Sequence, residues 1–491
     1  MQFVRRFINS KLQSTNGSKD DKSYIADLHS AAKSGYLESV VKLVDHGVDV
    51  ESVDKSGMTA LHHAASGGHR DVVTLLLDRG ADLMSADNFS LSALHFAAKN
   101  GHEDILLMLL DNGGDINSVD RNGMTSLHYA ARKGHRAIVV SLLGRGAVLM
   151  GADKDGATAL HIAVSSVQKE IVTLLLDRGA NLGSFDNEGA TALHYAARRG
   201  HKAILTLLID RGGDMTTVDN HGQTALHFAI ISGHKQIVIM LLSSGADVTS
   251  SDNNGMSALH FAATNGHGEL VAVLLDGGAD MAIVDNEGAT ALHCASNSGC
   301  TDVVILLLNK EDDVAKTDNY GQTALHLAVT SGHRELVTVL LDGGADMTSV
   351  DNEGATALHC AAHCGHKEIV MMLLDRGADL SSTDNNGLSA LHFATTSGYE
   401  QIVTVLLDVG ADIDSIDNEG ATALHYAANY GHEVIVILLL DRGVDVTIVD
   451  NHGMSALHFA TTSGHKEIVT VLIDSGADES KADNDDNIAL Q

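Results

Sequence analysis

The chain has 491 residues, of which 64 are Asp or Glu and 32 are Lys or Arg, so its formal charge is −32. An apolar fraction of 44% is ordinary for a folded protein and argues against an acidic disordered chain. Proline and tryptophan are absent, which excludes proline-rich and collagen-like classes, and no apolar run is long enough for a membrane span. Because an acidic chain repels nucleic acid, we expect no nucleic-acid partner.

The first 21 residues form a leader without any recognisable pattern. Met1 to Lys19 carries Arg5, Arg6, Lys11 and Lys19 and no acidic residue. We interpret residues 1–21 as a disordered leader. A transit peptide or an amphipathic helix on a membrane surface is the alternative, whereas a secretory signal would need a continuous apolar core.

From there on, the dipeptide Leu-His returns at a fixed interval. It occurs fourteen times, and successive histidines are 33 residues apart. A fixed period of this size is typical of repeat proteins whose units pack against their neighbours. The histidines are His29, His62, His95, His128, His161, His194, His227, His260, His293, His326, His359, His392, His425 and His458.

The second unit shows which elements each repeat contains. Thr59 lies three residues before His62, where its hydroxyl suits a helix N-cap, and a short apolar-faced helix follows. Gly68 ends this helix, and a second pattern of helical spacing runs from there to Gly80. A polar, turn-rich loop then leads to the next unit. The Asp that opens each loop, such as Asp54, is interpreted as a turn former and not as a calcium ligand, because the loops lack the alternating ligands of a calcium loop.

These residues resemble the ankyrin repeat, which has the same period and a Thr-Pro-Leu-His signature. Ala or Ser stands in place of the Pro, as in Thr59-Ala60-Leu61-His62, and Ala preserves the helix because it is the best helix former. The resemblance implies an all-α solenoid of helix-turn-helix units with projecting β-turn or hairpin loops. It also implies that each histidine from His62 to His458 is structural and braces the loop through bonds to Thr and the backbone.

The period divides the chain without an insertion. Residues 22–53 form an N-terminal capping repeat, in which Lys33 and Glu38 suit an outer polar face. Residues 483–491 are either a partial terminal repeat or the point where a longer array is cut. Between them lie thirteen repeats, at 54–86, 87–119, 120–152, 153–185, 186–218, 219–251, 252–284, 285–317, 318–350, 351–383, 384–416, 417–449 and 450–482.

With the capping repeat counted as the first, two repeats depart from the common pattern. In the fifth, Val167 replaces the glycine of the turn between the helices, and in the ninth, Glu311 replaces the glycine that ends the second helix. Both positions favour a left-handed backbone, which strains a residue that has a Cβ atom. We therefore predict that the solenoid opens first near these repeats.

The sequence offers little for catalysis or metal binding. It contains no phosphate-binding lysine loop, no Gly-x-Ser-x-Gly and no His-Glu-x-x-His, so we expect no enzyme activity and no cofactor. Equivalent histidines of stacked repeats lie about 10 Å apart, too far to share an ion. Cys360 and Cys364, four residues apart, are interpreted as reduced thiols, so no metal site is predicted. By resemblance, Asn117 occupies the position of ankyrin asparagine hydroxylation.

The best candidate for a partner site is a set of basic residues confined to the early repeats. The family binds partners through the loop tips and the two residues before Gly-His. Within the third to sixth repeats (87–218), the pair at this position carries basic residues in the third, fourth and sixth and is Ser165-Ser166 in the fifth, and the pairs become neutral later. We define the basic groove as Lys99, Arg132, Lys133, Arg198 and Arg199, and add three loop-tip residues, Phe89, Arg121 and Lys154.

These features predict a non-enzymatic scaffold that binds a protein partner, with an acidic segment in the basic groove. Residues 1–216 hold 23 basic and 25 acidic residues, whereas residues 217–491 hold 9 and 39. A structural spacer without a dominant site, or the ankyrin portion of a larger receptor, channel or enzyme, is the alternative. Four cysteines without a disulfide framework indicate a reducing compartment, so we expect the cytoplasm, with the nucleus or a mitochondrial leader as alternatives.

Overall fold

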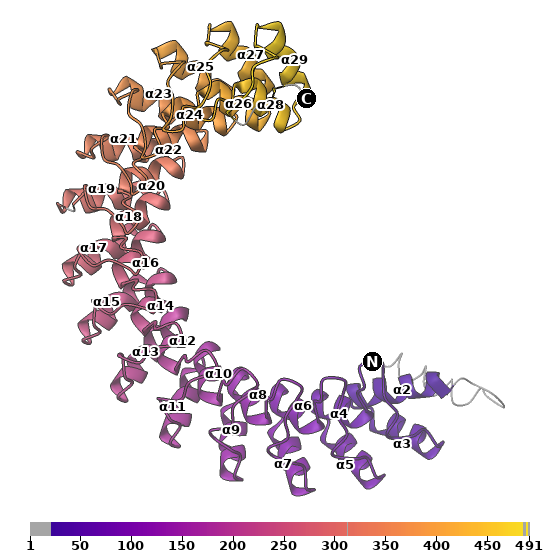
Figure 1. The fold of residues 1–491 in the computed structure, drawn as a ribbon. Coiled ribbons are helices and arrows are strands. Elements are labelled where there is room, and N and C mark those ends of the chain that lie inside the picture. Colours follow the sequence, from indigo (N-terminus) through magenta and orange to yellow (C-terminus); the bar gives the residue numbers. More distant parts are fainter. Residues whose placement is uncertain (1–20, 312, 485–487, 490–491) are drawn as a thin grey trace. The chain divides into compact units, whose positions relative to one another are not determined.

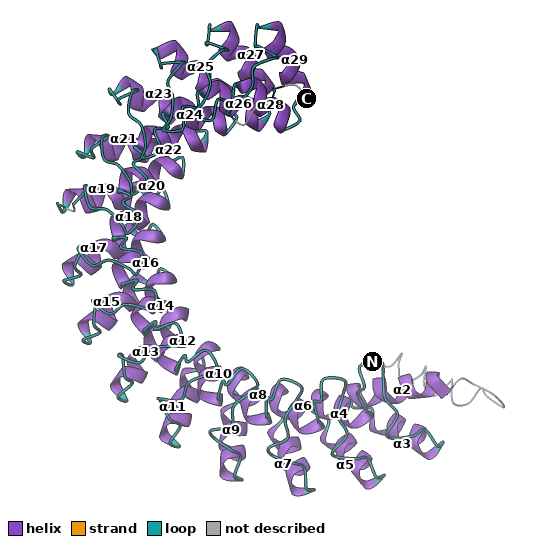
Figure 2. Cartoon of the chain, viewed as in Figure 1, coloured by secondary structure: helices purple, strands orange, loops and turns teal. Residues whose placement is uncertain are grey.

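The computed structural model describes residues 21–311, 313–484 and 488–489, so the predicted leader lies outside the described residues except for Asp21. The chain divides into two units, at residues 1–247 and 248–491, and each is described by itself. Helices and loops alone make up the described residues, apart from isolated backbone bridges (Figure 2). No described helix is long and apolar enough to cross a membrane.

In the first unit, helices alternate between two rows, each made of helices from successive repeats (Figure 1). The first helices of the repeats are α2 (Asp21–Ser34), α4 (Ala60–Gly67), α6 (Ala93–Asn100), α8 (Ser126–Lys133), α10 (Ala159–Ser165), α12 (Ala192–Arg199) and α14 (Ala225–Ile231). The second helices are α3 (Leu37–Asp45), α5 (Arg70–Asp78), α7 (Glu103–Asp111), α9 (Arg136–Gly144), α11 (Lys169–Asp177), α13 (Lys202–Asp210) and α15 (Lys235–Ser243).

The second unit repeats the same arrangement. Its first helices are α16 (Ala258–Thr264), α18 (Ala291–Asn297), α20 (Ala324–Thr330), α22 (Ala357–Cys364), α24 (Ala390–Thr396), α26 (Ala423–Tyr430) and α28 (Ala456–Thr462). Its second helices are α17 (Gly268–Asp276), α19 (Thr301–Asn309), α21 (Arg334–Asp342), α23 (Lys367–Asp375), α25 (Glu400–Val409), α27 (Glu433–Asp441) and α29 (Lys466–Asp474). The all-α class and the two-helix repeat are therefore confirmed.

The local sequence explains where each helix begins and ends. Thr59 is the N-cap of α4, as predicted, and Gly68 follows α4 with φ of 79°, a left-handed conformation that glycine adopts without strain. The two helices pack through a core that is nearly inaccessible to solvent. Leu61, Val73 and Leu76 are each at most 1% exposed, and their equivalents recur in the later repeats. Because small alanines separate the larger residues, successive first helices can approach closely.

Backbone bonds connect the loops of successive repeats. The Asn88 N–H donates to the Ser56 carbonyl oxygen at 2.9 Å, and the Asn187 N–H donates to Asp155 in the same way. Within a loop, the Oδ1 atom of Asp54 accepts the N–H groups of Ser56 and Met58 at 2.7 and 3.0 Å. The predicted role of this Asp as a turn former is confirmed.

Among the residues that the structure describes, three with side chains adopt the left-handed backbone that glycine has elsewhere. Val167 has φ of 61° and Glu311 has φ of 65°, as the pattern predicted. Ser90, with φ of 63°, replaces a loop glycine in the third repeat, and sequence reasoning missed it. The loop pattern continues beyond the repeat that ends at residue 482, because the Asn484 N–H donates to the His452 carbonyl oxygen at 2.9 Å.

Candidate functional site

Each repeat from 54 to 482 has one buried histidine at the start of its first helix, and in most of these repeats the ring also reaches a loop carbonyl oxygen. The Thr59 N–H donates to Nδ1 of His62 at 3.0 Å, and Nε2 of His62 lies 3.0 Å from the Ser85 carbonyl oxygen. Because Nδ1 accepts a hydrogen bond, the ring proton is on Nε2, which can donate to that carbonyl. The same bond from an N-cap N–H reaches Nδ1 in all thirteen of these repeats. The histidines therefore support the loops.

Burial lowers the pKa of rings such as His62 and His95, so these rings are neutral near pH 7. Their neutral state matches the hydrogen bonding, in which one ring nitrogen accepts and the other donates.

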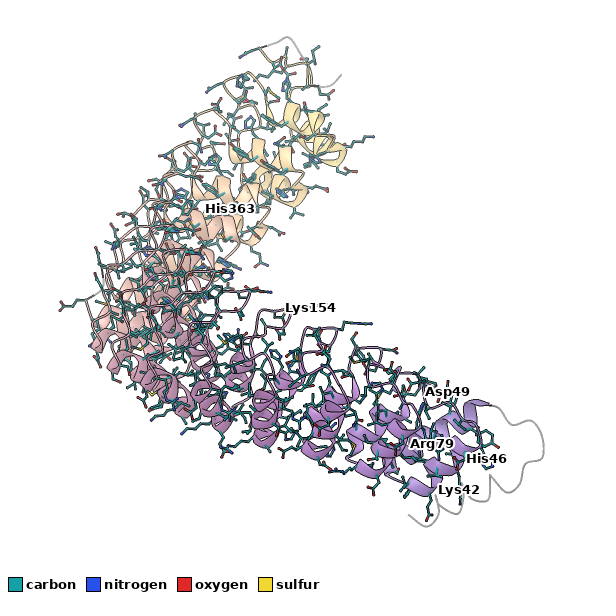
Figure 3. All side chains as sticks on the ribbon, turned by 90° about the horizontal axis from the view of Figure 1, so that it is seen from below. Lys42, His46, Asp49, Arg79, Lys154 and His363 are labelled. Atoms are coloured by element: carbon teal, nitrogen blue, oxygen red, sulfur yellow. The ribbon has the colours of Figure 1, made fainter. Side chains whose placement is uncertain are left out.

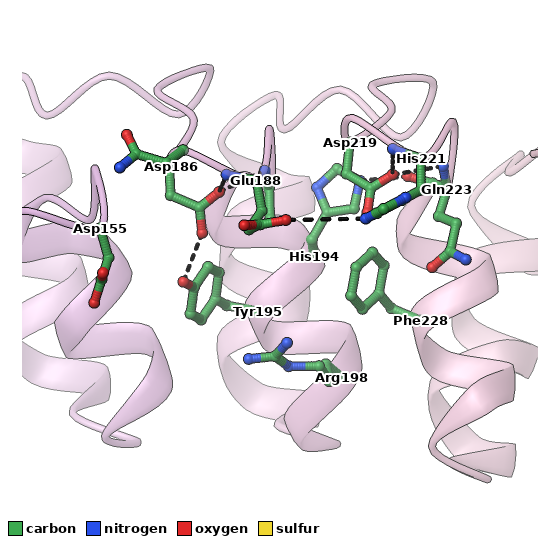
Figure 4. A pocket seen from close by; sticks show the side chains of 12 residues that line it. Asp155, Asp186, Glu188, His194, Tyr195, Arg198, Asp219, His221, Gln223 and Phe228 are labelled. Atoms are coloured by element: carbon green, nitrogen blue, oxygen red, sulfur yellow. Dashed lines mark hydrogen bonds and ion pairs between the residues drawn. The ribbon is translucent and has the colours of Figure 1, made fainter. Parts of the chain in front are cut away.

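A hollow of about 550 Å³ lies between the loops and the first helices of the sixth and seventh repeats (Figure 4). Arg198 projects into it from the end of α12, and Tyr195 lies one helical turn earlier. The Arg198 guanidinium carbon lies 5.3 Å from the ring centre of Tyr195 and 6.0 Å from that of Phe228. These distances are within the range of cation–π attraction, which holds the cation at the surface of the groove.

The same arrangement occurs two repeats earlier. The Arg132 guanidinium carbon and the Lys99 Nζ atom lie 6.0 and 5.7 Å from the ring centre of Tyr129. The Tyr129 hydroxyl donates to Asp120 at 2.7 Å, which fixes the ring beneath the two cations. The Tyr195 hydroxyl donates to Asp186 at the same distance. The first helices thus carry two aromatic platforms for basic side chains.

The structure separates the other predicted residues from these platforms. Lys133 and Arg199 are exposed at the ends of α8 and α12. Arg121 and Lys154 are exposed on the loops, and Figure 3 labels Lys154. Phe89 is 60% exposed, and its carbonyl oxygen accepts the Arg121 N–H at 2.8 Å. The loop-tip residues are therefore accessible, and Arg132 and Arg198 are exposed as well but lie against rings.

The hollow around Arg198 also contains carboxylates, which sequence reasoning missed. Asp155, Asp186, Glu188 and Asp219 line it. The Oδ1 atom of Asp186 accepts the N–H groups of Glu188 and Ala190 at 3.0 and 2.8 Å, and its Oδ2 atom accepts the Tyr195 hydroxyl. Both carboxylate oxygens of Asp186 therefore already accept hydrogen bonds from groups of the protein. The hollow is therefore of mixed charge, with one guanidinium among carboxylates.

A model of ankyrin repeats in three copies matches residues 28–120, 94–186, 183–252, 215–285, 259–351, 325–417 and 409–483. The chain belongs to the ankyrin-repeat family. A search of the curated proteins found no match. Ankyrin repeats generally mediate protein–protein interaction, and the aromatic platforms lie on the row of first ankyrin helices.

The second unit contains an ankyrin hollow of the same design. Asp417, Tyr426 and Phe459 line it, with a volume of about 230 Å³, and the Tyr426 hydroxyl donates to Asp417 at 2.6 Å. Asn429 occupies the position that Arg198 has in the sixth repeat. The two hollows therefore differ in charge at this position.

An asparagine ladder runs along the ankyrin loops and was also missed. The side-chain amide of Asn319 donates to the Asn286 carbonyl oxygen at 3.0 Å, and that of Asn352 donates to Asn319 at 2.9 Å. The pattern continues to Asn484. Arg121 and Lys154 replace the ladder asparagine in the fourth and fifth repeats. Repeated Asn after Asp was the signal in the sequence, but its meaning depends on how successive loops contact each other.

The remaining candidates contribute no reactive group. The four cysteines are free thiols, and burial raises the pKa of Cys360 to about 12, so its thiol stays protonated. The Oδ1 atom of Asn117 accepts the Val148 N–H at 3.0 Å. Hydroxylation of Asn117 stays a prediction.

Proposed function

We propose that this chain is a non-enzymatic scaffold that binds an acidic segment of a protein partner along the basic groove of the third to sixth repeats. One observation carries the proposal, namely that Arg132 and Arg198 both lie against tyrosines whose hydroxyls are bonded to Asp. A guanidinium held in this way loses less side-chain entropy on binding, and its N–H groups can pair with a carboxylate.

The spacing of these arginines suggests the form of the segment. They are two repeats apart, or about 20 Å if each helix contributes about 10 Å. An extended chain covers that distance in about six residues. The expected segment is therefore extended, with two acidic residues about six positions apart. Neutral or basic residues of the segment would face Asp155 and Glu188 between them.

The test measures binding of a fluorescent peptide with two glutamates six positions apart in an otherwise neutral sequence. The variant R132N/K133S/R198N/R199S introduces the Asn-Ser pair that residues 297 and 298 have naturally, so it should preserve the fold. Because each charge-assisted bond contributes about 1.5–3 kcal/mol, we expect at least a tenfold weaker affinity by fluorescence anisotropy.

A control variant, R136N/K169N/R178S/K202S, removes the same number of charges from exposed positions on the second helices and, at Arg178, directly after one of them. It should bind the peptide as the wild type does. Equal affinity of the groove variant and the wild type would refute the proposed site. An equal loss of affinity in the groove variant and the control variant would show that only net charge attracts the peptide, which would also refute the site. A peptide with adjacent glutamates serves to test the spacing.

A structural spacer is the second candidate, and the second unit favours it. The asparagine ladder continues there from Asn286 to Asn484. The hollow in the thirteenth repeat of the chain (417–449) has the neutral Asn429. The free thiols support our placement of the protein in the cytoplasm.

A further inference from the structure

Three potential metal ligands meet between the first and second repeats. They are His29 from α2, Asp54 from the loop that follows α3, and His63 from α4. One ligand atom of each lies within 4.8 Å of the others. The Nε2 atom of His63 lies 3.0 Å from Oδ2 of Asp54, and the two imidazole rings are 5.3 Å apart. Two imidazoles and a carboxylate are ligands that divalent transition metals use.

His63 is unusual among the residues at its position in the repeat. The residue after each Leu-His is Tyr in three repeats, at Tyr129, Tyr195 and Tyr426, and each of these hydroxyls donates to the Asp that opens its loop. The second repeat alone among the thirteen has histidine there. His63 keeps the contact with the loop Asp, here Asp54. Unlike a tyrosine hydroxyl, its imidazole can bind a metal ion once the nitrogen that faces Asp54 has lost its proton.

His29 differs from the later Leu-His histidines in a way that also favours ligation. In the later repeats, the N-cap N–H occupies Nδ1, so the proton is on Nε2 and neither nitrogen has a free lone pair. In the first repeat, the N-cap position is taken by Ala26, which lies inside α2 and has no hydroxyl. Nε2 of His29 donates to the Ser52 carbonyl oxygen at 2.9 Å, but no N-cap N–H holds Nδ1, so the proton can move to Nδ1 when Nε2 binds an ion.

We propose that His29, Asp54 and His63 bind one divalent transition-metal ion, such as Zn²⁺. The Ser56 and Met58 N–H groups, which donate to Oδ1 of Asp54, orient the carboxylate. A water molecule, or the Ser52 carbonyl oxygen 2.9 Å from Nε2 of His29, completes the coordination. Equivalent histidines of stacked repeats lie too far apart to share an ion, whereas these three residues occupy three different positions of the repeat and therefore meet. The ion would join the capping repeat to the second repeat.

The experiment titrates the full chain with Zn²⁺ by calorimetry and compares it with His63→Tyr. Tyrosine occurs naturally at this position in other repeats and can donate to Asp54, so the variant should fold. Zn²⁺ at other histidines would appear equally in both proteins. We expect the wild type to bind one additional ion, and the variant to lose this site by more than the 10–100-fold typical of a lost outer-shell partner.

A second measurement follows hydrogen exchange. In the wild type, Zn²⁺ should slow exchange in α2 and α4, and in the variant it should not. Equal Zn²⁺ stoichiometry and affinity in the two proteins would overturn the proposal, as would a wild type that binds no ion at this site. Asp54→Asn, which keeps an oxygen to accept the loop N–H groups, should also weaken the site.

Discussion

Buried histidines of the repeats make stability depend on pH. Burial lowers the pKa of rings such as His62, His161 and His326. The unfolded chain, in which the pKa is near 6.5, therefore binds more protons than the folded chain as the pH falls. Stability is fully present above that pKa and is lost as the pH falls below it.

We predict that the free energy of unfolding decreases between pH 7 and pH 5.5. Each ring can contribute at most about 1.4 kcal/mol per pH unit. Urea denaturation at a series of pH values measures this change. A constant or rising stability over that range would show that the rings are protonated in the folded state.

Val167 is a second residue whose effect can be isolated. Its left-handed backbone, with φ of 61°, costs about 1–2 kcal/mol relative to glycine, and its side chain is 56% exposed, so little burial would be lost. Glycine costs about 0.5–1 kcal/mol of chain entropy in return. Val167→Gly should therefore stabilise the chain by roughly 0.5–1 kcal/mol in urea denaturation. Ser166→Gly, at a residue with φ of −94°, is the control and should not stabilise.

Among the elements, the second helices are connected by ion pairs between successive repeats. Arg211 pairs with Asp177 at 2.9 Å, and Arg376 pairs with Asp342 at 2.6 Å. Gly144, the last residue of α9, stands where most other repeats have an Asp, opposite Arg178. Space is available there, because an added Cβ atom would meet nothing within 4 Å.

Gly144→Asp should consequently stabilise the fourth and fifth repeats. The gain in helix propensity is about 0.5 kcal/mol and an exposed ion pair adds up to about 1 kcal/mol. Thermal unfolding of this variant, of Gly144→Ala and of each combined with Arg178→Ala separates the two contributions. If the Arg178→Ala change cost the same in both backgrounds, no ion pair would have formed.

The elements show what sequence could and could not predict. Helix ends at Thr59 and Gly68 were predictable because capping and glycine rules are local. Ser90 was predictable by the same glycine rule and was overlooked. The asparagine ladder and the group of His29, Asp54 and His63 were not predictable, because they depend on which non-equivalent positions of neighbouring repeats meet. The carboxylates around Arg198 were missed for the same reason.

At the scale of the whole molecule, stability should vary along the chain. Val167 and Glu311 both have strained left-handed backbones, so the repeats that contain them should open more readily than their neighbours. Native-state hydrogen exchange should show faster exchange in α10 and α11, and in α18 and α19, than in α24 and α26. Uniform protection across these helices would contradict this prediction.

The charge of the molecule is also uneven, with a net of −2 over residues 1–216 and −30 over residues 217–491. An acidic partner should therefore approach the early repeats and be repelled by the later ones. Because such repulsion is screened by salt, its contribution should weaken as ionic strength rises.

Hydrogen exchange of the full chain, with and without the peptide that carries two glutamates six positions apart, tests the central claim most directly. We predict slower exchange in α8, α12 and the loops that carry Arg121 and Lys154, and unchanged exchange in α26, where Asn429 replaces the arginine. Protection of α26 equal to that of α12, or no protection in either helix by a peptide that binds, would contradict a partner site in the basic groove.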